Sequence, residues 1–134
     1  MNVLVIAPHP DDEVLGVGGT IAKYVAAGHN VYVCIVTKGC SPLFKPEDVA
    51  QVRSECRMAD DILGVKKIYF LDFPAAMLED VPRYKLNDAI ARVVQEIKPD
   101  EVYLPHRGDM QIDHKMIVDA VSYTHLTLPT TSRV

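Results

Sequence analysis

The chain has 134 residues and a formal net charge of −4, with 14 Lys and Arg against 18 Asp and Glu. This length allows one domain with a hydrophobic core, and the negative charge argues against nucleic acid as a partner, because such proteins carry a basic surface. No apolar run approaches the length of a membrane-spanning helix, so a membrane is not an expected partner either.

The N-terminus and the cysteines predict a cytoplasmic protein. Asn2 leads straight into an apolar run, without the charged and apolar regions of a signal peptide. Cys34, Cys40 and Cys56 form an odd set without metal-knuckle spacing, so reduced thiols are expected. The oligomeric state stays open, and a homo-oligomer is one alternative.

Four short apolar runs alternate with helical patterns along the chain. We expect strands at 2–7, 31–37, 67–71 and 101–104. This alternation predicts parallel β-α-β units with right-handed crossovers. The expected fold class is therefore α/β, a Rossmann-like three-layer sandwich with a mostly parallel sheet.

A charged motif, His9-Pro-Asp-Asp-Glu13, lies between the first strand and a helical pattern. Charge next to a hydrophobic element is costly unless something binds it, and a metal ion is the simplest such partner. Imidazole and carboxylate both suit zinc. His9 and Asp12 are three residues apart, so a turn could bring both to one ion and leave Asp11 free to handle protons.

The acids of this motif are also typical of a helix start. One of them would cap the first turn, and the others would favour the positive end of the helix dipole. A cap does not need His9, which favours the metal interpretation, but both interpretations stay open.

The topology joins this motif to a second one. Asp113-His114 follows the fourth expected strand. If the strand order is 3-2-1-4, the order reverses between strands 1 and 4, and ligands of open α/β sheets bind at such a point. His9, Asp12 and His114 are then expected to meet there.

These two motifs, with Gly18-Gly19-Thr20 in the first helix, resemble the PIG-L/LmbE-like family of zinc-dependent N-deacetylases of acetylated amino sugars. The resemblance covers residues 2 to about 121. It implies Zn²⁺ as cofactor, held by His9, Asp12 and His114, and an acetylated amino-sugar substrate. Asp11 would take a proton from the attacking water.

Several other positions gain an interpretation from the resemblance. Gln111 stands where many relatives have a histidine, and its amide could donate a hydrogen bond to an oxyanion but could not shuttle protons. Asp113 is expected either to orient neighbouring polar groups or to cap a helix. Arg53 is a substrate-binding candidate, with a solvated surface charge as the alternative. Ala75-Ala76 replaces the Asp-Gly of many relatives.

The last residues do not fit this pattern. Residues 122–134 lack helical periodicity and resemble translated adaptor sequence, so we expect them to break the fourth helix and stay outside the sheet. The prediction is one partial domain, 1–121, truncated after the fourth β-α unit, followed by a non-native tail.

Two alternatives to a zinc deacetylase remain. A magnesium-dependent phosphoryl or nucleotide hydrolase could use Asp11 and Asp12, although magnesium prefers oxygen over histidine nitrogen. The other alternative is an inactive, truncated binding module.

Overall fold

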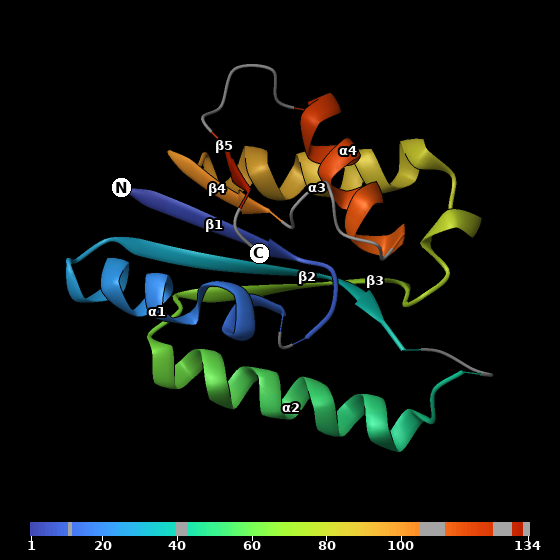
Figure 1. The fold of residues 1–134 in the computed structure, drawn as a ribbon, viewed down its shortest axis with the longest axis horizontal. Coiled ribbons are helices and arrows are strands. Elements are labelled where there is room, and N and C mark those ends of the chain that lie inside the picture. The colour runs from blue at the N-terminus through green and yellow to red at the C-terminus, as the bar shows by residue number, and fades with distance from the viewer. Residues whose placement is uncertain (11, 40–42, 105–111, 125–129, 133–134) are drawn as a thin grey trace.

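A computed structural model describes residues 1–10, 12–39, 43–104, 112–124 and 130–132. Its elements in chain order are β1 (Asn2–Ala7), α1 (Asp12–Ala26), β2 (Asn30–Lys38), α2 (Pro46–Leu63), β3 (Lys67–Pro74), the 3₁₀ helix η1 (Leu78–Asp80), α3 (Arg83–Ile97), β4 (Glu101–Leu104), α4 (Ile112–Thr124) and β5 (Thr130–Ser132). Helices α1 and α2 lie on one face of the sheet and α3 and α4 on the other (Figure 1). The predicted α/β three-layer architecture is confirmed.

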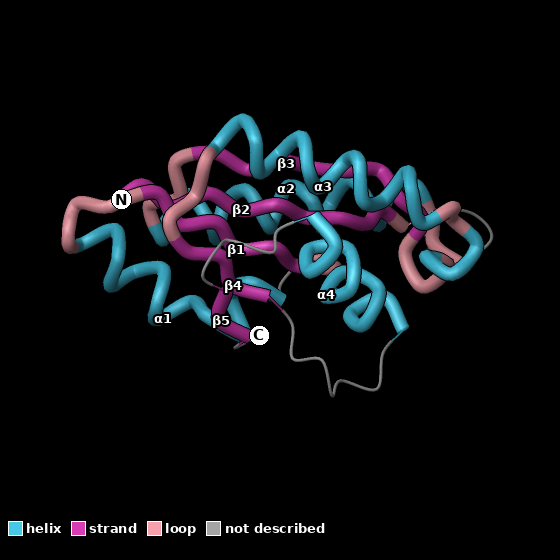
Figure 2. Tube along the Cα trace, turned by 90° about the horizontal axis from the view of Figure 1, so that it is seen from above, coloured by secondary structure: helices cyan, strands magenta, loops and turns pink. Residues whose placement is uncertain are grey.

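The strands pair in the order β3-β2-β1-β4-β5, which Figure 2 shows side by side. All four pairings are parallel. Val3 of β1 lies opposite Val31 of β2 and opposite Glu101 of β4. The predicted order of the first four strands is confirmed, and it reverses between β1 and β4.

The central strand β1 is apolar on both faces because helices cover both faces of the sheet. Leu4 and Ile6 belong to the core with α3 and α4. Val3 and Val5 point to the other face and belong to the core with α1 and α2. This double burial fixes the position of the turn that follows β1.

The expectation that residues 122–134 break the fourth helix and stay outside the sheet is wrong at two places. Helix α4 continues to Thr124, and Thr130–Ser132 forms β5, with Thr131 opposite Tyr103 of β4. Without β5, the N–H and C=O groups of β4 would form an unpaired sheet edge. The domain boundary at residue 121 remains a prediction.

None of the helices in the described part of the chain combines the length and apolar character that a bilayer crossing requires.

Gly64 is expected to tolerate no side chain. It ends α2 with φ 86°, and an added Cβ would lie 2.6 Å from Val25 Cγ1 of α1. We predict that Gly64→Ala lowers the free energy of unfolding by about 2–3 kcal/mol, because left-handed backbone and overpacking both act against it. Urea denaturation measures this change.

Gly28→Ala is the matched control. Gly28 has the same φ of 86° but nothing within 4 Å of an added Cβ, so only the backbone term of about 1 kcal/mol applies. Equal losses in the two variants would contradict the close approach of α1 and α2 at Gly64.

Candidate metal centre

The turn after β1 folds His9 and Asp12 onto each other. The backbone N–H of His9 donates to Asp12 Oδ2 at 3.0 Å, and the N–H of Asp12 donates back to the His9 carbonyl at 3.3 Å. The same carboxylate oxygen lies 3.4 Å from His9 Nδ1. The turn thus holds one imidazole and one carboxylate side by side.

His114 reaches this pair from the first turn of α4. Its Nε2 lies 3.4 Å from Asp12 Oδ2, and its ring centroid is 5.5 Å from that of His9. One ligand atom from each of the three residues lies within 4.8 Å of the others. The structure therefore brings together the three side chains that the sequence proposed as metal ligands, and their role as ligands stays a prediction.

Asp113 is buried behind this cluster and holds three segments together. Its Oδ2 accepts hydrogen bonds from His9 Nε2 at 2.9 Å and from the Ala76 N–H at 2.7 Å. Its Oδ1 accepts one from the Leu78 N–H at 3.3 Å. These three hydrogen-bond partners lie outside α4, which favours the orienting role over the helix cap.

Charge pairing sets the protonation of His9 and Asp113. The hydrogen bond to Asp113, followed by that to Asp12, raises the pKa of His9 to about 9. Burial alone would raise the pKa of Asp113, but its hydrogen bonds with His9, Ala76 and Leu78 lower it below the usual value. In the absence of a metal ion, His9 therefore holds a proton between two carboxylates.

Thr37 of β2 supports the start of the turn, and sequence reasoning missed it. Its hydroxyl donates to the Pro8 carbonyl at 2.8 Å, and its backbone N–H donates to the same oxygen at 3.0 Å. Nothing in the sequence around Thr37 marks this role, because the bond depends on the parallel pairing of β1 with β2.

Arg53 lies beside the cluster, in the same cavity wall as His9. The cavity has a volume of about 390 Å³, and apolar side chains including Phe44, Val49 and Val52 line much of it. Arg53 Nη2 donates to the Leu71 carbonyl at 3.1 Å and pairs with an Asp72 carboxylate oxygen at 2.9 Å. Arg53 is thus a partly buried wall residue rather than a fully solvated charge.

Ala76, which also lines this cavity, occupies an unusual backbone conformation. It is a non-glycine residue with φ 61°, in the left-handed region, and this conformation costs about 1 kcal/mol or more. The strain accompanies its N–H bond to Asp113. Ala75 and Ala76, which replace the Asp-Gly expected from the resemblance, therefore both lie at the cavity.

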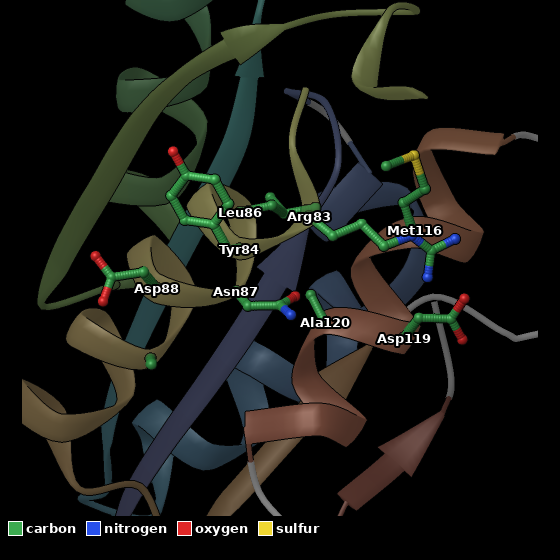
Figure 3. Close-up of a pocket in the computed structure, with 9 residues that line it drawn as sticks. Arg83, Tyr84, Leu86, Asn87, Asp88, Met116, Asp119 and Ala120 are labelled. Carbon is green, nitrogen blue, oxygen red and sulfur yellow. The ribbon is translucent and has the colours of Figure 1, made fainter. Parts of the chain in front are cut away.

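A larger cavity lies elsewhere. It has a volume of about 690 Å³, between α3 and α4, with Arg83 and Asn87 on one side and Met116 and Asp119 on the other (Figure 3). None of the three proposed metal ligands lines it, so the smaller cavity beside His9 is the better candidate for substrate.

Three residues singled out in the sequence, Asp11, Cys40 and Gln111, lie outside the described residues. The catalytic roles proposed for Asp11 and Gln111 remain predictions.

Glu13 is a second residue that sequence reasoning missed. As part of a helix start it would be solvated, yet the structure buries it completely. Burial, followed by the charge of Asp60, raises the pKa of Glu13 to about 7.

A comparison with models of known protein families shows which family the chain belongs to. The PIG-L family model, described as GlcNAc-PI de-N-acetylase, matches residues 4–124. The chain belongs to the PIG-L family. The resemblance based on the two motifs is therefore confirmed.

Relatives of this PIG-L chain are named as deacetylases. Probable N-acetyl-alpha-D-glucosaminyl L-malate deacetylase 2 of Bacillus anthracis is 30% identical over 98% of this chain and 62% of its own length. Diacetylchitobiose deacetylase of Thermococcus kodakarensis is 33% identical over 93% of this chain and 51% of its own length.

A solved structure that is similar to this chain also belongs to a protein named as a deacetylase. N,N'-diacetylchitobiose deacetylase from Pyrococcus horikoshii, complexed with its inhibitor MPG, superposes with a TM-score of 0.79 and 30% identity, over 93% of this chain and 51% of that one. The PIG-L chain thus spans about half to three fifths of the length of these relatives.

The metal-free stability of this PIG-L chain is expected to fall at alkaline pH because of His9. Its pKa is 6.5 when unfolded and about 9 when folded, so its contribution is full below pH 6.5 and is lost as the pH rises through 9. We predict that, in chelator, wild type loses more unfolding free energy than His9→Gln between about pH 6 and about pH 9.5. Parallel losses in the two proteins would contradict the His9–Asp113 pair.

Proposed function

We propose that this chain binds Zn²⁺ through His9, Asp12 and His114 and removes the acetyl group from an N-acetylated amino sugar or sugar conjugate. The observation that carries the proposal is the meeting of these three side chains, from the turn after β1 and the first turn of α4, within 4.8 Å. Membership of the PIG-L family and the deacetylase names of the relatives support the reaction type.

The donor set fits zinc better than magnesium. Two imidazole nitrogens and one carboxylate oxygen are typical of catalytic zinc sites, which keep a further position open. Magnesium prefers oxygen ligands throughout. The hydrogen bond from His9 Nε2 to Asp113 leaves Nδ1 facing Asp12, and such a carboxylate partner orients a ligating histidine.

When bound, zinc would activate water for attack and polarise the acetyl carbonyl. In the proposed reaction, Asp11 takes the proton from the attacking water and can return it to the leaving amine. Gln111 would donate a hydrogen bond to the developing oxyanion. Asp113 holds the imidazole of His9 in place and does not contact the substrate.

The cavity beside His9 is the proposed sugar site. Its volume of about 390 Å³ lies within the usual range for small-molecule pockets. Arg53 lines this cavity, so its guanidinium could donate a charge-assisted hydrogen bond to a substrate oxygen. A cytoplasmic location and the absence of a nucleic-acid partner remain predictions from the sequence.

Mutation should distinguish the roles of the two adjacent aspartates, Asp11 and Asp12. We predict that Asp12→Ala lowers both bound zinc and acetate release, because it removes a ligand. Asp11→Asn should keep zinc near the wild-type level and lower turnover by about 10²-fold or more, the usual effect of losing a general base. Metal analysis of protein purified without chelator, together with acetate release from diacetylchitobiose, measures both effects.

His29→Ala is the matched histidine control. His29 precedes β2 and contacts the N-terminal amine at 2.9 Å, so its loss should leave the zinc content unchanged.

Full activity of Asp11→Asn with zinc bound would place the base elsewhere. Magnesium-dependent turnover without zinc would favour the phosphoryl-hydrolase alternative, and zinc binding without acetate release would contradict deacetylation by this chain.

Arg53 is expected to act on substrate affinity. We predict that Arg53→Ala raises KM by about 10-fold or more, the worth of one charge-assisted hydrogen bond, with a smaller effect on kcat. Arg57→Ala is the control, because Arg57 also stacks on the Phe70 ring, at 4.9 Å against 4.6 Å for Arg53, but does not line the cavity. An unchanged KM with a lower Tm would make Arg53 a structural brace instead.

A further inference from the structure

A second cluster of acidic side chains lies where α1 packs against α2. Glu13 comes from the first turn of α1, and Cys56 and Asp60 lie four residues apart on α2, so both face the same side of that helix. All three residues have a relative exposure of 0%. Cys56 belongs to the apolar core that contains Val17 and Ile21.

Cys56 lies between the two carboxylates. Its Sγ is 3.3 Å from Glu13 Oε1 and 3.7 Å from Asp60 Oδ2. One ligand atom from each residue lies within 4.8 Å of the other two. Three groups that all lose protons on ionisation thus share one buried space.

Hydrogen bonding within the cluster leaves one oxygen of Glu13 without a partner among the described residues. A thiol carries one proton, so Cys56 cannot donate a full hydrogen bond to both carboxylates. Glu13 Oε2 is buried and has no hydrogen-bond partner among the described residues. A buried polar atom without a partner is unfavourable, and this oxygen would be satisfied by a cation in the cluster.

The spacing of the ligand atoms matches a tetrahedral metal site. Zinc binds sulfur at about 2.3 Å and carboxylate oxygen at about 2.1 Å, which places the two atoms about 3.6 Å apart across a tetrahedral angle. The observed separations of 3.3 and 3.7 Å lie on either side of this value. The sulfur ligand favours zinc over magnesium or calcium.

We propose that Glu13, Cys56 and Asp60 form a second site for a divalent cation that accepts sulfur ligands, such as zinc. Binding displaces the thiol proton of Cys56, and any proton held on the carboxylates, to solvent. The site does not depend on the proposed deacetylase activity. Its ion would join α1 to α2 through Glu13, which directly follows Asp12. It would thereby hold the start of α1 in the position that brings Asp12 to the first site.

Cobalt bound in place of zinc can distinguish the two proposed sites. A thiolate ligand to cobalt gives a charge-transfer absorption band in the near ultraviolet, whereas histidine and carboxylate ligands do not. The protein is produced in cobalt-containing medium without chelator. The double variant His9→Ala/His114→Ala removes both nitrogen ligands of the first site. We expect it to keep about one cobalt per chain, the occupancy of a single remaining site, together with the thiolate band.

Cys56→Ser in the otherwise wild-type chain should lose the thiolate band and keep cobalt at the histidine site. Cys34→Ala is the matched control, because Cys34 is equally buried but lies in the core with α3 and α4, and its band should persist. A wild-type protein without a thiolate band, or a band that survives Cys56→Ser, would overturn the proposal. Loss of histidine-bound cobalt with a retained thiolate band would instead contradict only the first site.

Discussion

The parallel pairing of β1 with both β2 and β4 is the constraint on which the site depends. Because all three strands run the same way, their carboxyl ends meet at one edge of the sheet. The turn with His9 therefore lies next to the first turn of α4 with His114, although these two histidines are 105 positions apart in the sequence. Thr37 adds to this arrangement, since the pairing places its hydroxyl and its N–H on the Pro8 carbonyl.

The buried side chain of Asp113 adds hydrogen bonds that hold the same segments together. One buried carboxylate accepts hydrogens from His9, Ala76 and Leu78, so it links the β1 turn, the segment after β3 and the start of α4. The backbone of Ala76 is strained at this contact because it is left-handed. Such a conformation is maintained only where the surrounding structure fixes it. A glycine at this position would adopt the same conformation without that strain.

The sequence predicted the strands, their order and the meeting of His9, Asp12 and His114, because apolar runs mark buried strands and parallel topology then orders their ends. It did not predict what depends on distant partners. Strand β3 extends to Pro74 because β2 continues beside it, and β5 forms on the edge of β4 without an apolar pattern. The burial of Glu13 depends on Cys56, which lies 43 residues away.

The first turn of α1 shows why the helix-start and metal-site interpretations do not exclude each other. Asp12 Oδ2 accepts the His9 N–H, which closes the turn, and the same oxygen lies 3.4 Å from a nitrogen of each histidine. Successive helix residues point about 100° apart, so Glu13 faces α2 while Asp12 faces the histidines. Both carboxylates gain from the positive end of the helix dipole. That gain is at most about 2 kcal/mol, less than the several kcal/mol that a buried ionised group requires. The dipole can therefore support the partly exposed Asp12, but the fully buried Glu13 needs a proton or a cation as well.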